Sequence, residues 1–172
     1  GLVRDAAEFE PLARSVPDNG GVYLVPAFGG LGLPQWSPNA RAALTGLSNQ
    51  SDRRHVARAG LESIAYQIRD ALEALRAEAG APLVTMHADG GATANKFLMQ
   101  FTADLTGTPL HVAPMADGSP LGAALAGLLG MGVFKSLAEL AGRSAASVVF
   151  TPNMDSGVAR RLYDGWSRAV QQ

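Results

Sequence analysis

Two adjacent glycines follow an apolar segment near the middle of the chain, and residues that can form a helix follow them at once. Gly90 and Gly91 come after residues 83–88, and residues 92–106 carry apolar side chains at helical spacing. Because glycine has no Cβ, a ligand can approach the backbone closely there. The start of a helix adds backbone N–H groups and a positive dipole end. With Asn95 able to bond a base or sugar, the pattern predicts a backbone-lined wall for a nucleotide.

The glycine pair alone fits an ordinary tight turn between a strand and a helix equally well. It is not a Walker A loop, because no Lys-Ser or Lys-Thr follows at the required spacing, and it is not a full G-x-G-x-x-G fingerprint. The nucleotide interpretation therefore depends on the rest of the chain.

The surrounding pattern predicts an α/β fold, with a small sheet flanked by helices. We expect short strands over residues 22–25, 83–88 and 110–113, an extended run over 148–150, and an irregular loop over 28–38. The expected helices cover residues 5–15, about 52–79, 92–106, a segment opening at 119–120, 137–140 and about 155–170.

Local signals set the ends of two of these helices. Ser51 or Asp52 can cap the long helix at its start, and Gly80 suits its end. Ser119 is expected as the N-cap of the later helix, with Pro120 in its first turn. The small residues that follow predict close packing of that helix against a neighbour.

Composition limits the possible functions. The 172 residues suit one domain with a core of its own, and the net charge of −1 favours neither nucleic acid nor an anionic membrane. The absence of cysteine excludes disulfides, zinc-thiolate sites and a cysteine nucleophile. Residues 121–134 are too short and glycine-rich to span a bilayer. We expect a cytoplasmic protein, and the first residues suggest a fragment of a longer chain.

Five segments together resemble the FGGY family of carbohydrate kinases and stand in the family's order. They are GVYLVPAF at 21–28, GLGLPQW at 30–36, LESIAYQ at 61–67, DGGATANKFLMQF at 89–101 and LGAA at 121–124. The resemblance runs over nearly the whole chain. Ser37, Ala42 and Ser119-Pro120 depart from the family's residues at their positions.

The resemblance implies the last part of the C-terminal lobe of a two-lobed, actin-like (ribonuclease H-like) ATPase fold. Residues 1–172 would be an incomplete C-terminal ATP-binding domain that lacks the N-terminal lobe and the start of its own lobe. The family's adenosine contacts carry over to Gly90, Gly91, Ala92 and Asn95.

The resemblance carries over no catalytic residue and no metal ligand. The family's catalytic Asp, substrate pocket, phosphate loops and Mg²⁺ site would lie upstream of Gly1. The full-length enzyme would transfer a phosphoryl group from ATP to a polyol or sugar hydroxyl, and the present chain alone would be inactive and bind ADP weakly.

Three alternatives remain for the function of the chain. Glycerol is the favoured substrate, and another polyol or a pentulose such as xylulose is the close alternative. A non-catalytic, actin-like nucleotide-binding or interaction module is an alternative of another class. An isolated lobe would also expose apolar surface, so a homo-oligomer is possible.

Several further residues have structural interpretations. Glu62 and Gln67 are expected to support the long helix, and Phe28 and Trp36 to pack their loop. Asp117 is expected to cap the helix that follows it. The three histidines, His55, His87 and His111, show no metal-ligand spacing.

Overall fold

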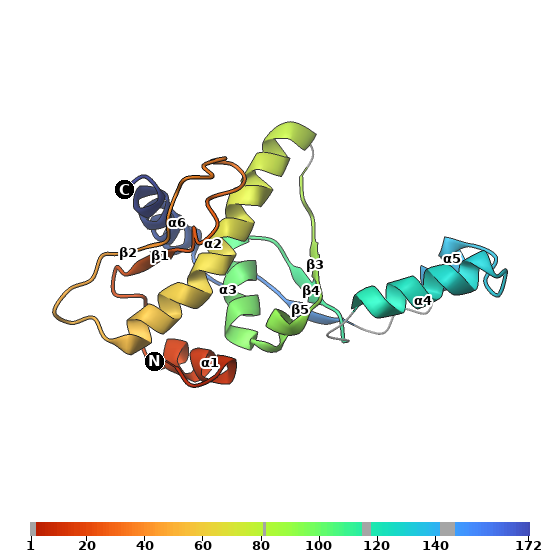
Figure 1. Cartoon of the computed structure of the whole chain (residues 1–172), viewed down its shortest axis with the longest axis horizontal. Coiled ribbons are helices and arrows are strands. Elements are labelled where there is room, and N and C mark those ends of the chain that lie inside the picture. The colour runs from red at the N-terminus through yellow and green to blue at the C-terminus, as the bar shows by residue number, and fades with distance from the viewer. Residues whose placement is uncertain (1–2, 81, 115–117, 142–146) are drawn as a thin grey trace.

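A computed structural model of the chain describes residues 3–80, 82–114, 118–141 and 147–172 (Figure 1). Its helices, including two 3₁₀ turns labelled η, are η1 Ala6–Glu8, α1 Phe9–Arg14, α2 Arg53–Ala79, η2 Gly91–Ala94, α3 Lys96–Thr106, α4 Gly118–Gly130, α5 Leu137–Ala141 and α6 Ser156–Val170. Its strands are β1 Tyr23–Val25, β2 Ala43–Thr45, β3 Met86–Ala88, β4 Leu110–Val112 and β5 Val148–Phe150.

The strands form two small sheets. β1 and β2 pair antiparallel, and the second sheet has the order β3-β4-β5, with β3 parallel and β5 antiparallel to β4. Parallel neighbours need a crossover, which α3 provides between β3 and β4. The predicted mixture of short strands and helices is confirmed. β2 was not predicted, because its three residues are defined only by pairing with distant β1.

The long helix α2 runs through the centre of the molecule (Figure 1), and its ends are those that the sequence predicts. The Asp52 side chain accepts a hydrogen bond from the Arg54 backbone N–H, and the Asp52 backbone N–H donates to Nδ1 of the His55 ring. Gly80 ends the helix with φ 61°, a left-handed conformation that glycine adopts without strain.

The core lies where α2, α3 and α6 meet. The Tyr66 ring of α2 stacks on Trp166 of α6 at 5.3 Å between centroids and meets Phe101 of α3 edge-on at 5.8 Å. Buried Asp70 accepts hydrogen bonds from Trp166 Nε1 at 2.9 Å and from the Tyr163 hydroxyl at 2.5 Å. Because both donors sit on α6, Asp70 fixes that helix to α2.

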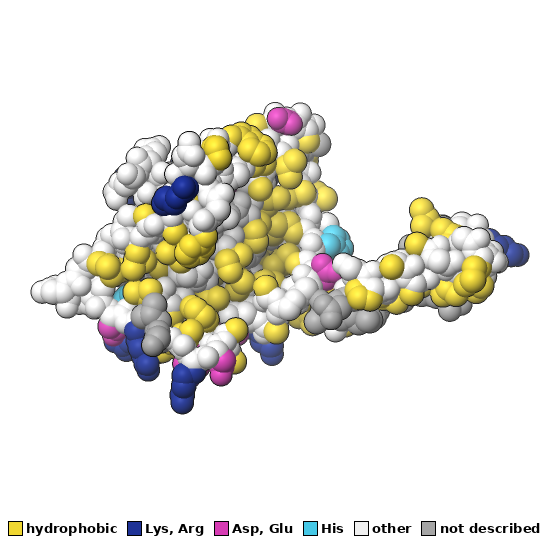
Figure 2. Space-filling model, in the orientation of Figure 1, with side chains coloured by type: hydrophobic (Ala, Val, Ile, Leu, Met, Phe, Trp, Pro, Cys, Tyr) yellow, Lys and Arg dark blue, Asp and Glu magenta, His cyan; other side chains and the backbone are white. Residues whose placement is uncertain are grey.

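The segment 118–141, which contains α4 and α5 and is called the arm below, projects away from this core (Figure 1). No residue of α4 is buried, so the predicted close packing of its small residues is wrong for the described part of this chain. Figure 2 shows hydrophobic side chains on the arm and over the end of α2 and β3, where Leu75 and Val84 are exposed.

Two helix starts differ from those predicted. The helix expected over 92–106 begins at Lys96, because residues 91–94 form the 3₁₀ turn η2. α4 begins at Gly118, so Ser119 is inside the helix and not its N-cap. Pro120 is tolerated because N–H groups of a first turn have no intrahelical partner. Asp117 lies outside the described residues. No helix in the described segments is long and apolar enough to cross a bilayer.

Candidate functional site

The glycine pair forms a tight turn at the end of β3. Gly90 has φ 98°, a conformation that L-amino acids with side chains rarely adopt. Its carbonyl accepts two hydrogen bonds from Thr93, from the backbone N–H at 3.1 Å and from the hydroxyl at 2.7 Å. The Asn95 N–H donates to the Ala92 carbonyl at 3.1 Å. The turn is therefore held by its own hydrogen bonds.

The outer side of this turn is open. A Cβ built on Gly90 or on Gly91 would meet no atom within 4 Å. Gly91 and Ala92 are exposed, and Gly90 is half-buried. These glycines are therefore not required by close packing inside the described chain. The turn presents bare backbone that a flat ligand can approach.

Gly118, at the start of the arm, has a close neighbour instead. A Cβ on Gly118 would collide with the Asp89 carboxylate, which precedes the glycine pair. The glycine turn and the first residue of α4 are therefore neighbours in space.

Asn95 has a different place from the one predicted. It is the N-cap of α3 and not a residue of the first helical turn: its Oδ1 accepts from the Leu98 N–H at 2.9 Å. Its carbonyl accepts from the Met99 N–H at 3.1 Å. The cap uses Oδ1 and does not involve the Nδ2 amide group, which carries two N–H donors. Asn95 lies four residues past Gly91, at the other end of η2. The four residues predicted to contact adenosine therefore belong to one short turn.

The start of α3 does not offer a row of free N–H groups. The Lys96 N–H donates to Glu10 Oε2 at 3.0 Å, and the Leu98 N–H is taken by Asn95. The expected free donors are therefore not found at Lys96 and Leu98. Glu10 was not found from the sequence, because it lies 86 residues before Lys96 and no local pattern links the two.

Glu62 has the structural role that was predicted. It is fully buried and receives hydrogen bonds from Arg58 Nε at 2.7 Å, Asn19 Nδ2 at 3.1 Å and the Tyr66 hydroxyl at 3.2 Å. Burial raises the pKa of the Glu62 carboxyl, and the bond from Arg58 opposes that rise. Gln67, on the same helix, is exposed.

The predicted packing of Phe28 and Trp36 is wrong. Their exposed fractions are 79% and 72%, so neither ring is covered by its own loop. Trp36 has φ 47°, unusual for a residue with a bulky side chain.

His87 and His111 face each other on neighbouring strands, with ring centroids 5.1 Å apart. Their spacing of 24 residues hid this pairing, which the parallel register of β3 and β4 creates. Among the described residues, no group of three or more His, Cys, Asp or Glu side chains is arranged to hold a metal ion.

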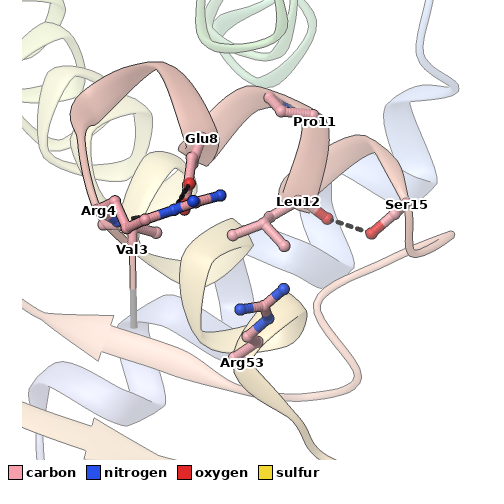
Figure 3. A pocket seen from close by; sticks show the side chains of 7 residues that line it. All are labelled: Val3, Arg4, Glu8, Pro11, Leu12, Ser15 and Arg53. Carbon is pink, nitrogen blue, oxygen red and sulfur yellow. Dashed lines mark hydrogen bonds and ion pairs between the residues drawn. The ribbon is translucent and has the colours of Figure 1, made fainter. Parts of the chain in front are cut away.

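A shallow cavity of about 570 Å³ lies at α1 and the start of α2 (Figure 3). Its lining residues are Val3, Arg4, Glu8, Pro11, Leu12, Ser15 and Arg53. None of them belongs to the glycine turn, so the candidate site is an open wall and not this cavity.

Residues 2–131 match the model of the FGGY family of carbohydrate kinases, C-terminal domain. The chain belongs to this family. It is 47% identical over 170 residues to the glycerol kinase of Shewanella baltica (strain OS185), and 46% identical over 171 residues to that of Pseudomonas fluorescens (strain SBW25). These alignments cover 99% of this chain and 34% of each relative. The chain thus spans about a third of the length of the relatives it matches.

The fold is also shared with solved structures. A crystal structure of Plasmodium falciparum glycerol kinase with ADP matches 99% of this chain and 34% of its own, with a TM-score of 0.87 and 33% identity. A ligand-bound xylulose kinase from Lactobacillus acidophilus matches 98% of this chain and 35% of its own, with a TM-score of 0.84 and 23% identity. The predicted actin-like α/β fold is confirmed.

Proposed function

We propose that this chain forms the adenosine-binding part of an ATP-dependent kinase that phosphorylates glycerol. The observation that carries the proposal is the open glycine turn, which exposes backbone beside Asn95. Close packing requires neither glycine, and Gly91, unlike Gly90, has no positive φ that would call for glycine. Membership of the FGGY family supports a nucleotide as the ligand. The Plasmodium falciparum glycerol kinase, similar over this segment, was solved with ADP.

Each residue of the turn has a distinct part in this proposal. Gly90 and Gly91 let the adenine or ribose lie against the backbone, because a Cβ at either position would point into the space that the ligand needs. Ala92 continues this surface with a small side chain. Asn95 donates from Nδ2 while its Oδ1 remains the cap of α3.

Glycerol is favoured over a pentulose by the pattern of similarity. Glycerol kinases are 45% to 47% identical over nearly the whole chain. Among solved structures, the Plasmodium falciparum glycerol kinase is 33% identical, against 23% to 29% for the xylulose kinases. The residues that hold the substrate are not among those of the candidate site, so this preference rests on the similarity.

The remaining parts of the reaction belong, in this proposal, to the rest of a full-length kinase. In that enzyme ATP and Mg²⁺ supply the phosphoryl group and its charge neutralisation, and a carboxylate base accepts the proton of the substrate hydroxyl. Residues 1–172 would act as the C-terminal ATP-binding domain. Because phosphoryl transfer depends on positioning all of these groups, the chain alone would be inactive.

Binding and activity of the purified 172-residue chain test the proposal. In a two-dimensional NMR titration with ADP, the amide signals of Gly90 to Asn95 should shift, with weak affinity. Shifts confined to other elements, or none at millimolar ADP, would overturn the site. Two results would contradict the proposal that the catalytic base and the phosphate-binding groups belong to the rest of the enzyme. They are ATP-dependent phosphorylation of glycerol by this chain, and a sub-micromolar dissociation constant for ADP.

A further inference from the structure

Glu10 of α1 reaches the first backbone amide of α3. Its Oε2 accepts the hydrogen bond from the Lys96 N–H at 3.0 Å, across 86 residues of sequence. Its Oε1 pairs with Arg14 at 2.8 Å. The Glu10 side chain is only 25% exposed. This carboxylate is therefore held in place at the end of the turn that presents Asn95.

The contact between α1 and α3 is strengthened around Phe97, in the first turn of α3. The Arg14 guanidinium lies 5.7 Å from the centre of the Phe97 ring, and the Arg58 guanidinium lies 5.1 Å from it. Arg58 is itself fixed by buried Glu62 at 2.7 Å. The start of α3 is thus tied both to α1 and to the buried polar network of α2.

The charge of Glu10 has a consequence for ligands. The N-terminal end of a helix attracts anions, because its N–H groups point outward and the helix dipole is positive there. In this chain the carboxylate of Glu10 already takes up that position at α3. A second anion at this helix end would find the Lys96 N–H already occupied and would meet the Glu10 carboxylate, whose charge Arg14 balances only in part. An uncharged nucleoside would meet no such charge repulsion.

We propose that Glu10 is a positioning and specificity residue for the glycine turn. It fixes the first amide of α3 and thereby Asn95, and its charge directs phosphate groups away from this end of the turn. The nucleoside then lies against Asn95 and the phosphates lie beyond it. The specificity role rests on the proposed function, because that function supplies the ligand. The positioning role rests on the hydrogen bonds alone.

Two substitutions separate the hydrogen bond from the charge. Glu10→Gln keeps an acceptor for the Lys96 N–H but removes the charge, and Glu10→Ala removes both. Glu8→Gln is the matched control: it makes the same change of charge in the adjoining η1, where Glu8 pairs with Arg4 and not with α3. The 172-residue chain is used throughout, with adenosine and ADP as the probes in NMR titrations.

Glu10→Gln should bind adenosine within twofold of wild type and ADP about threefold more tightly, the effect of removing one charge at a helix end. Glu10→Ala should bind adenosine about tenfold more weakly. Glu8→Gln should leave both affinities within twofold. An equal gain in ADP affinity in Glu8→Gln and Glu10→Gln would overturn the specificity role, because it would reflect only net charge.

Amide hydrogen exchange without ligand tests the positioning separately. Glu10→Ala should accelerate exchange at Lys96 and Asn95 about tenfold, and Glu10→Gln should restore the wild-type rate. Unchanged exchange in Glu10→Ala would overturn the positioning role. If the wild type bound neither adenosine nor ADP, the proposed function and the specificity role would fail together, while the exchange rates would still decide the positioning role.

Discussion

The helical core and the arm use apolar residues in opposite ways. In the core, α2 is amphipathic, and its apolar side chains pack against α3 and α6 around Tyr66 and Trp166. In the arm, α4 has no charged residue and yet buries none of its thirteen residues. A helix that is apolar on all sides normally lies inside a larger structure. The described part of the chain therefore gains its stability from the core.

The glycine turn lies where the two regions meet. It follows β3, which packs on the core side, and Asp89 beside it touches Gly118 at the start of the arm. The scaffold that fixes Asn95 belongs to the core through Glu10 and Phe97. Substitutions that destabilise the core should therefore disturb the glycine turn, and substitutions in the arm should leave the turn intact.

The largest expected effect is loss of the central aromatic side chain. Trp166→Ala removes a ring that stacks on Tyr66 and donates to Asp70, and should lower the free energy of unfolding by about 3–5 kcal/mol. Trp36→Ala is the matched control, because Trp36 is exposed, and should change it by less than about 0.5 kcal/mol. Urea unfolding followed by circular dichroism measures both. Equal effects would refute the assignment of the core.

The next effect concerns the buried carboxylate. Glu62→Ala leaves Arg58 without its buried partner and should cost about 3 kcal/mol of unfolding free energy. Glu73→Ala, which removes a half-exposed partner of Arg76 on the same helix, should cost less than about 1 kcal/mol. The same urea titrations compare the two. A cost for Glu62→Ala no greater than that for Glu73→Ala would show that the network contributes little.

A smaller effect is expected in the arm. Leu121→Ser replaces an exposed apolar side chain of α4 and should change the unfolding free energy of the core by less than about 0.5 kcal/mol. In the wild type, α4 amides should exchange with solvent at least a hundredfold faster than those of α3, because a short helix without tertiary packing is marginal in water. Slow exchange throughout α4 would mean that the arm is covered in solution.

The smallest effect lies at the cap of α2. The hydrogen bond from the Arg54 side chain, together with that from its backbone, lowers the pKa of the Asp52 carboxyl below its ordinary value of 3.8. A carboxyl whose pKa is lower in the folded than in the unfolded chain stabilises the fold at pH values above its unfolded-state pKa. This stabilisation is lost as the pH falls through the folded-state pKa. The difference in stability between wild type and Asp52→Asn should therefore shrink as the pH falls below about 4. Urea titrations at several pH values measure this difference in unfolding free energy. A difference that stayed the same from pH 5 down to pH 2 would contradict this account.

The features predicted from sequence are those with local causes. Asp52 and Gly80 mark the ends of α2 because a cap and a left-handed stop act within a few residues. The five motifs predicted the family because their order was informative as well as their residues. The glycine turn was located correctly, although its role in binding a nucleotide remains a proposal.

The features missed have causes far away in the sequence. β2 exists only through its pairing with β1, and Lys96 meets Glu10 only because α1 packs on α3. The start of α3 was placed four residues early, because residues 92–94 are compatible with a helix and the capping role of Asn95 depends on the turn before it. The packing of Phe28, Trp36 and α4 was mispredicted because apolar residues were assumed to be covered.

The central claim is that the open glycine turn is a wall for the adenosine end of a nucleotide, and a pair of substitutions tests it most directly. Gly91 and Gly32 both have room for a Cβ and neither has a positive φ, so Gly91→Leu and Gly32→Leu should both fold as the wild type does. In NMR titrations with ADP, Gly91→Leu should weaken binding at least tenfold, since its side chain fills the space where the ligand lies, and Gly32→Leu should bind within twofold of wild type. Undiminished ADP binding by a folded Gly91→Leu chain would contradict the account.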